Sequence, residues 1–490
     1  METGFPKLRA EFGRIDGEWL FMGRRGRGVA GLSLAASAGL LGTYVGYPGL
    51  RKAHAATTCE VTKTSDTIAQ LTEGELRYCL EQVDDNGGGT ITFADSANGT
   101  IELNDDLPGV RVDSSLTITG NGDDNTIIDG GGTFGGLYFR FFDGTTATVT
   151  DIAIQNMNRS DGGAGIRSIG EPSDVEVRNS TFTSNTSASN FGGGGAIYSF
   201  DNVTVTNSTF TGNTSASNFG GGGAIRADDV VTVTNSTFTS NTATNGEGGA
   251  IYSRDDVTAT NSTFTSNTAT KGGAIYVLDL SLNFVTVSGN TTSGGSSAAV
   301  DSDGDATVTN SIIYGNTGGD VKAGVTLSAS YSLFSSSSSV SPALSGSSLI
   351  FGEDPLLGSL ADNGGPTQTM LPAAGSPVIG TANPVGAPST DQRGFARTTN
   401  GLADMGAVQR AAVAPEPDLS QVPPSWLQAQ GREQREASCP PGMAPSWAQW
   451  PNEGTGGWTC EYTTWWDVNE GVGGGWVTTP GLRAGGLPTS

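Results

Sequence analysis

Arginine and tyrosine side chains recur directly after the isoleucine of a glycine-rich phrase such as GGAI. The five residues are Arg167, Tyr198, Arg226, Tyr252 and Tyr276. Guanidinium and phenol groups in one row could hold an acidic or neutral polysaccharide by charge, hydrogen bonding and ring contacts. The same residues could instead form a cation–π ladder that only stiffens the protein. Both a polysaccharide-binding surface and a structural ladder therefore fit the pattern.

Aspartates gather at one point of successive repeats, most densely in the segment DSDGD, where Asp301, Asp303 and Asp305 alternate with small residues. Stacked carboxylates repel one another unless a cation neutralises them, and oxygen ligands of this kind suit calcium. The sequence thus offers a calcium site at these three residues. A solvated turn on an acidic protein is the other interpretation.

The end of the chain, residues 438–490, is rich in tryptophan. Aromatic faces stack on sugar rings, so this module could display a glycan-binding surface. In so short a module the same side chains could instead be its hydrophobic core. The candidate residues are Trp447, Trp450, Trp458, Trp465 and Trp466.

The sequence excludes several kinds of chemistry and partner. Its one histidine, His54, lies in a segment that reads as an export leader, so the mature chain cannot run a Ser-His-Asp or Cys-His mechanism. The net charge is −24 and no basic patch interrupts it, which argues against nucleic acid as a partner.

Residues 1–55 are typical of a bacterial signal peptide, with basic residues, an apolar run and the small-residue site AHA. Translation could start at Met1 or Met22, and Arg24 with Arg25 fits a twin-arginine signal. An uncleaved membrane anchor is the alternative. No second apolar run is long enough to span a membrane, so we expect a secreted or cell-surface protein without a transmembrane segment in its mature form.

The four cysteines form two local pairs near the two ends of the mature chain. Their even number and short spacing in an exported chain predict the disulfides Cys59–Cys79 and Cys439–Cys460.

The elements that position these residues come from an internal repeat. NSTF recurs with Phe182, Phe210, Phe238 and Phe264, and residues 185–197 and 213–225 are identical. Each unit holds short runs of period-two alternation and no helical pattern, which predicts an all-β, right-handed parallel β-helix. Recurring asparagines, such as Asn207 and Asn213, would form side-chain ladders from coil to coil.

The phrases GGAI and FTSN resemble the repeats of polymorphic outer-membrane proteins and related pectate-lyase-like β-helix proteins. Residues 354–409, which include NGGPTQTMLP and DMGAVQ, resemble the end of the choice-of-anchor Q family of bacterial surface proteins. ELRYCLEQV with GGTITF resembles a module that often opens such chains. The resemblance implies a surface location but supplies no catalytic motif.

We expect a signal peptide (1–55), an N-terminal capping module (56–90), β-helix repeats (91–350), a C-terminal cap (351–410), a linker (411–437) and the tryptophan-rich module (438–490). The favoured function is a monomeric, non-enzymatic adhesin or cell-wall and glycan-binding protein. The first alternative is a calcium-dependent polysaccharide lyase of the pectate-lyase-like kind. The second alternative is ice binding, suggested by paired outward threonines such as Thr204 and Thr206.

Overall fold

The structure is a computed structural model that describes residues 57–410, apart from 142–144, 171–172, 191, 219, 295–296 and 400. It also gives the backbone of four strands outside this range. These are β1 (Glu11–Ile15) and β2 (Glu18–Met22), which pair antiparallel, and β42 (Met443–Gln449) and β43 (Gly456–Tyr462), which also pair antiparallel. Residues 1–55 form a unit separate from the rest of the chain.

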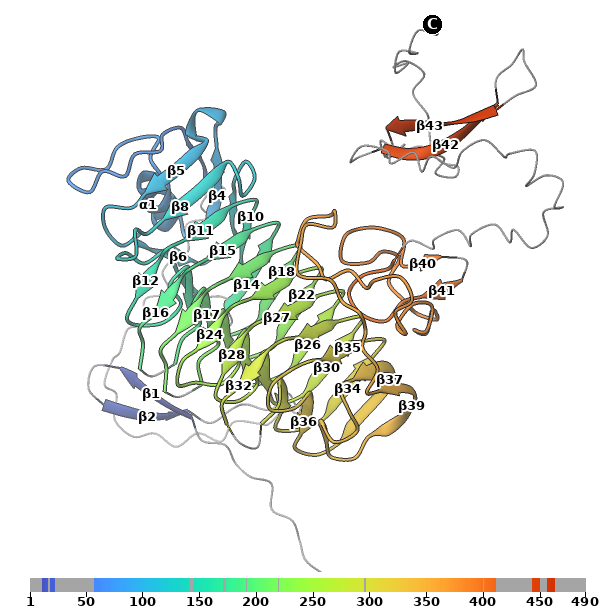
Figure 1. Cartoon of the computed structure of the whole chain (residues 1–490). Helices are drawn as coiled ribbons and strands as arrows, with labels where there is room; N and C mark the ends of the chain where they lie inside the picture. Colours follow the sequence, from blue (N-terminus) through green and yellow to red (C-terminus); the bar gives the residue numbers. More distant parts are fainter. Residues whose placement is uncertain are drawn as a thin grey trace, which may run out of the picture. The chain divides into compact units, whose positions relative to one another are not determined.

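Residues 57–351 wind into a parallel β-solenoid in which each coil contributes one strand to each of several sheets (Figure 1). The repeated phrases become strands because valine, isoleucine, phenylalanine and threonine favour extended backbone and asparagine or glycine turns it between strands. A ten-stranded sheet, called here the isoleucine sheet, contains β6 (Gly109–Val112), β9 (Leu137–Phe141), β13 (Ile166–Ile169), β17 (Ile197–Ser199), β21 (Ile225–Ala227), β25 (Ile251–Ser253), β29 (Ile275–Val277), β33 (Val300–Ser302), β36 (Val321–Ala323) and β38 (Val340–Ser341).

The other strands of each coil form two further columns and a short sheet. The valine column contains β3 (Thr57–Val61), β4 (Gly89–Phe93), β7 (Leu116–Thr119), β10 (Thr145–Thr150), β14 (Ser173–Arg178), β18 (Val203–Thr206), β22 (Val231–Thr234), β26 (Val257–Thr260), β30 (Leu280–Asn283), β34 (Ala306–Thr309), β37 (Leu327–Phe334) and β39 (Ser345–Phe351). The phenylalanine column contains β5 (Gly99–Glu102), β8 (Thr126–Asp129), β11 (Ala153–Gln155), β15 (Thr181–Thr183), β19 (Thr209–Thr211), β23 (Thr237–Thr239), β27 (Thr263–Thr265), β31 (Thr286–Ser288) and β35 (Ile312–Tyr314), and it continues into the last residues of β37 and β39. The short sheet contains β12 (Asn158–Arg159), β16 (Thr186–Ser187), β20 (Thr214–Ser215), β24 (Thr242–Ala243), β28 (Thr268–Ala269) and β32 (Thr291–Thr292).

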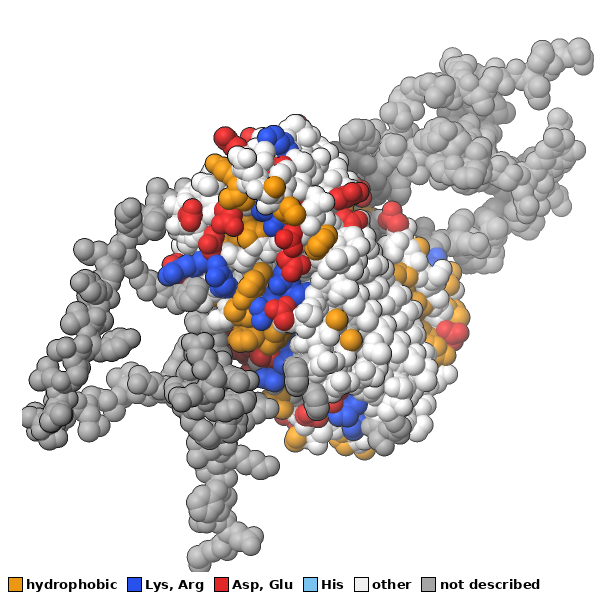
Figure 2. Space-filling view, turned by 90° about the vertical axis from the view of Figure 1, so that its left-hand side faces the viewer, with side chains coloured by type: hydrophobic (Ala, Val, Ile, Leu, Met, Phe, Trp, Pro, Cys, Tyr) orange, Lys and Arg blue, Asp and Glu red, His pale blue; other side chains and the backbone are white. Residues whose placement is uncertain are grey.

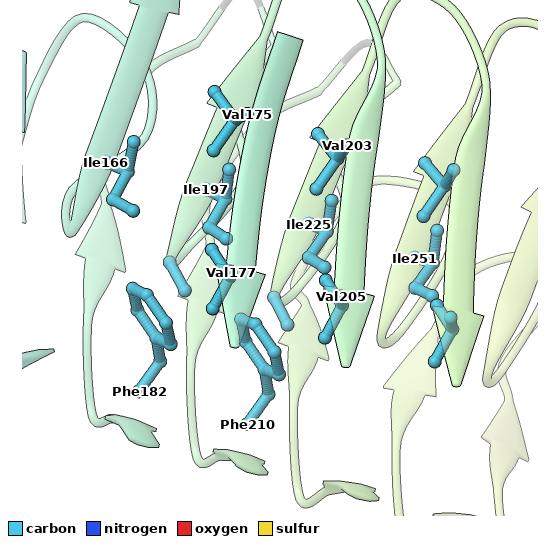
Figure 3. Packing of buried hydrophobic residues seen from close by; sticks show 14 of the residues in the cluster. Ile166, Val175, Val177, Phe182, Ile197, Val203, Val205, Phe210, Ile225 and Ile251 are labelled. Carbon is cyan, nitrogen blue, oxygen red and sulfur yellow. The ribbon is translucent and has the colours of Figure 1, made fainter. Parts of the chain in front are cut away.

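The core runs along the solenoid as stacks of like side chains. In β18, Val203 and Val205 are buried while Thr204 and Thr206 face outward, as the alternation predicts. Isoleucines of the isoleucine sheet lie opposite these valines (Figure 3). The rings of Phe182, Phe210, Phe238 and Phe264 stack with centroids 4.8, 4.7 and 4.9 Å apart. The register is thus set by identical residues packing on identical residues.

Buried asparagines form the expected side-chain ladder inside one turn of the solenoid. Asn213 Nδ2 donates to Oδ1 of Asn241 at 2.9 Å, and the same bond repeats one coil along, from Asn241 to Asn267. The ladder extends from Asn185 to Asn316. A second row at a neighbouring corner joins Asn179, Asn207 and Asn235, which adopt left-handed backbone conformations.

A serine ladder, which the sequence analysis missed, lies beside the second asparagine row. The backbone N–H of Ser208 donates to Oγ of Ser236 at 3.1 Å, and that of Ser236 donates to Oγ of Ser262 at 3.2 Å. The phrase NSTF therefore encodes a turn residue, a buried serine, an outward threonine and a core phenylalanine.

The N-terminal residues join the same stack of strands. Strand β3 pairs parallel with β4, which pairs with β7. Helix α1 (Leu76–Asn86) buries Leu76, Leu80 and Val83, and the Cys59–Cys79 disulfide ties it to β3. A short 3-10 helix, η1 (Asp95–Ala97), follows β4. The helix and disulfide close this end of the core.

Residues 354–410, called here the flank segment, contain β40 (Thr398–Thr399) and β41 (Leu402–Ala403) but are otherwise irregular. The C-terminal cap predicted for residues 351–410 would have to lie across the last coil. The described contacts of this segment lie instead along the side of several coils. Gln392 bonds Thr237 and Thr263, and Asn261 accepts from the buried Arg397 at 2.5 Å. The polar, outward residues of the repeat supply these partners.

Candidate functional site

The five predicted arginines and tyrosines form one outward row of the isoleucine sheet, called here the arginine–tyrosine row. Cα pairing joins Arg167 to Tyr198, Tyr198 to Arg226, Arg226 to Tyr252 and Tyr252 to Tyr276. The row extends to Tyr138 on one side and to Asp301 and Lys322 on the other. The sequence analysis assigned none of these three to the row and named Asp301 only as a calcium candidate.

Within this row the groups largely satisfy one another. The Arg226 guanidinium lies between two tyrosines, with its carbon 5.0 Å from the Tyr198 ring centre and 5.7 Å from that of Tyr252. It also pairs with Asp228 at 3.1 Å, and the residue is only 3% exposed. Tyr252 and Tyr276 stack in parallel at 5.8 Å. The stiffening ladder is therefore present, whatever else the row does.

Glycine-rich loops pass very close to the row. A Cβ added to Gly192 would lie 1.2 Å from Nη1 of Arg226, and one added to Gly220 would lie 2.6 Å from the Tyr252 ring. Glycine permits this approach, which explains the GGGG runs that precede Ala196-Ile197 and Ala224-Ile225. The loops bury the Arg226 side chain and leave its neighbours half-buried.

A second outward row consists of the residues two positions after each member of the arginine–tyrosine row, and parts of it are more open to solvent. Its members include Phe200, Asp228, Arg254 and Leu278. Phe200 and Leu278 are each 37% exposed, and Arg254 is half-exposed beside Asp228 at 3.5 Å. The Phe200 ring meets Tyr198 at an interplanar angle of 60°, so it is turned relative to the arginine–tyrosine row. Period-two alternation could have revealed this row, but the sequence analysis followed only the residue after isoleucine.

One band on the surface holds side chains of mixed type. Figure 2 shows hydrophobic, basic and acidic side chains gathered together there, beside a broad area of uncharged polar side chains and backbone. The two rows of the isoleucine sheet contain side chains of all three kinds, such as Phe200, Arg254 and Asp228. Paired threonines on the valine column are also in register, such as Thr204 with Thr232, so ice binding stays a prediction.

Carboxylates form a further row at the turn after the isoleucine sheet. Burial, with the neighbouring Asp255 and Asp201 carboxylates, raises the pKa of Asp229 to about 6. Burial is also the main cause that raises the pKa of Asp256, with help from Asp255 and Asp279. The raised pKa values express the repulsion among carboxylates that the sequence implies at this turn.

The three aspartates predicted to bind calcium are not brought together. Asp301 is buried, accepts a hydrogen bond from Ser297 at 2.7 Å and lies 3.6 Å from Nζ of Lys322. Asp303 accepts from the Tyr276 hydroxyl at 2.9 Å. Asp305 accepts from Thr326 at 2.6 Å. Strand β33 ends at Ser302, so Asp303 and Asp305 lie in the turn beyond it and each of the three side chains has its own partner. Residues 57–410, as far as they are described, hold no group of three acids, cysteines or histidines placed for a metal ion.

Burial and nearby carboxylates also make the tyrosines weak acids. Burial, with the nearby Asp228 carboxylate, raises the pKa of Tyr198 to about 12. Burial and the hydrogen bond to Asp303 also raise the pKa of Tyr276. Neither phenol can therefore ionise near neutral pH to act as a base.

Other predicted residues lie outside the part that the structure describes. These are the leader, Cys439 with the second disulfide, and the side chains of Trp447, Trp450, Trp458, Trp465 and Trp466. No helix among the described residues is long and apolar enough to cross a membrane.

Comparison with known proteins supports the architecture. A family model described as the right handed beta helix region matches residues 135–317. No curated protein and no solved structure matches the chain. Over the matched residues the chain is similar to right-handed β-helix proteins, as the repeat predicted.

Proposed function

We propose that this chain is a secreted or cell-surface protein that binds a polysaccharide or cell-wall polymer without cleaving it, as an adhesin or wall-associated protein does. The observation that carries the proposal is the band formed by the two outward rows of the isoleucine sheet. Its positions recur once per coil, although the side chain differs from coil to coil. It presents a half-exposed ring at Phe200, an apolar group at Leu278 and a cation at Arg254. A periodic surface of this kind suits a periodic polymer.

The charges of the band favour a neutral glycan over a polyuronate. Arg226 and Arg254 pair with Asp228, and Lys271 pairs with Glu247 at 2.6 Å. An anionic polymer would have to displace these carboxylates and would also meet the row around Asp229. Ring stacking on Phe200 needs no such exchange.

Binding fits the geometry better than catalysis does. A lyase needs one cluster where a metal or cation, a base and the substrate converge, and fold likeness does not supply it. In the described part of the chain, Asp301, Asp303 and Asp305 have separate partners and no group of three possible ligands converges. Two surface cavities, of about 430 and 600 Å³, contain none of the residues of the two rows.

The experiment is a pull-down of the mature chain on insoluble neutral glycans and wall preparations. Phe200→Ser and Leu278→Ser should each weaken binding about 5–10-fold, which corresponds to roughly 1–1.5 kcal/mol of ring or apolar contact. Val385→Ser is the matched control, because Val385 is 82% exposed but lies in the flank segment. Equal binding by all four proteins would contradict the proposed surface.

A further inference from the structure

The last strand of the solenoid, β39, has a free edge within the described residues. It pairs with β37 along one side, and no described strand pairs with its other side (Figure 1). Gly346, Ser347 and Ser348 are exposed. Phe351 stacks on the buried Phe334 at 5.8 Å yet is 37% exposed, so the end of the core stack meets solvent there.

This edge lacks the devices that keep strand edges from pairing. Its sequence, SGSSLIF, contains no charged residue and no proline. Native proteins usually protect edges with such residues or cover them, because an open row of N–H and C=O groups recruits another strand. At the opposite end, helix α1 fills the core and β3 carries the exposed Glu60. The two ends are therefore different, and β39 is the one that needs a cover.

The flank segment does not provide that cover. It packs on the outward side of the last coils, where Leu357 and Val378 share an apolar cluster with Leu333 and Ile350. However, it returns the chain to this end of the solenoid. Arg410 Nη1 donates to the carbonyl of Pro372 at 2.6 Å, and Pro372 forms a bridge with Leu357. Leu357 and Ile350 of β39 pack against the same apolar cluster.

We propose that a strand from residues 443–462 pairs with the free edge of β39 and closes this end of the solenoid. Strands β42 and β43 are seven residues long, as β39 is. Residues 411–442 could span up to about 100 Å when extended, so the connection imposes no limit. Strand addition supplies the missing backbone hydrogen bonds.

Hydrogen exchange of the full chain, read at single residues, tests this proposal. Alternate amides of β39 that face away from β37 should exchange on the order of 100-fold more slowly than an unpaired strand does. Thr459→Pro removes a donor within β43 and should abolish this protection, whereas Gln430→Pro, in the linker, should leave it intact. Light scattering of the same samples reports the mass.

Two results would overturn the proposal. Fast exchange of those β39 amides in a monomeric full chain would show that the edge is open. Protection that survives Thr459→Pro but disappears on dilution, together with a doubled mass, would show that a second copy covers the edge instead.

Discussion

Replacing Asn241 by alanine tests the buried asparagine ladder. Its Oδ1 accepts from Nδ2 and from the backbone N–H of Asn213, at 2.9 and 3.0 Å. Its Nδ2 donates to the carbonyl of Phe210 at 3.0 Å and to Oδ1 of Asn267 at 2.9 Å. The side chain is fully buried, so water cannot replace these partners.

The loss should be large for a single polar residue. Truncation leaves two donors on Asn213 and the Phe210 carbonyl without this partner. At about 1–3 kcal/mol for each of these three buried groups, we expect the free energy of unfolding to fall by about 3–9 kcal/mol. Asn207→Gly is the control. Asn207 donates to Asn179 and accepts from Asn235, each at 3.1 Å, in the second asparagine row. The bond to Asn179 is exposed and glycine keeps the left-handed backbone, so the loss there should stay near 1 kcal/mol.

The assay is denaturant unfolding followed by circular dichroism, with hydrogen exchange to locate the loss. Because solenoids can unfold in parts, exchange should accelerate first in the coils that contain Asn213 and Asn267. If Asn241→Ala lowers stability no more than Asn207→Gly does, the ladder is not a main source of stability and the reasoning fails.

Three further predictions concern the carboxylate row, the core stack and the flank segment. Because the pKa of Asp229 is raised to about 6, its charged form destabilises the fold, fully so above about pH 6. After allowance for solvent screening, Asp229→Asn should therefore stabilise the protein by about 1 kcal/mol at pH 8 and should have no effect at pH 3. Melting curves recorded at both pH values test this. Phe210→Ala opens the ring stack and should cost about 3–5 kcal/mol in denaturant unfolding; a loss below 1 kcal/mol would contradict the stack's role. Arg397→Ala removes hydrogen bonds to Asn261, Gly406 and Ala407 and should loosen the flank segment. Limited proteolysis should then cut residues 354–410 faster while the solenoid stays intact. An unchanged rate of cleavage would contradict the importance of these contacts.

The repeat made most of the solenoid predictable from sequence. Val203 and Thr204 alternate as expected, and Asn213 lies in the predicted ladder, because identical coils must place identical side chains at one position. The second asparagine row is only partly a ladder, since Asn261 bonds the carbonyl of Thr390 instead of a neighbouring asparagine.

The flank segment could not be placed from sequence. It has little regular structure, and its position depends on partners far away in the chain, such as Gln392 with Thr237.

The candidate site was predicted only in part from the sequence. Tyr198 and Arg226 could be found because each directly follows the isoleucine of a repeat. Their burial against each other depends on glycine-rich loops, and no local sequence pattern determines the path of those loops.

The central claim is that the chain binds a polysaccharide without cleaving it. The most direct test incubates residues 56–490 with plant, algal and bacterial wall polysaccharides, with and without calcium, and measures both retention and new reducing or unsaturated ends. We predict retention on a neutral glycan, with no new ends in either condition. New unsaturated ends that EDTA abolishes would contradict the account and identify a lyase.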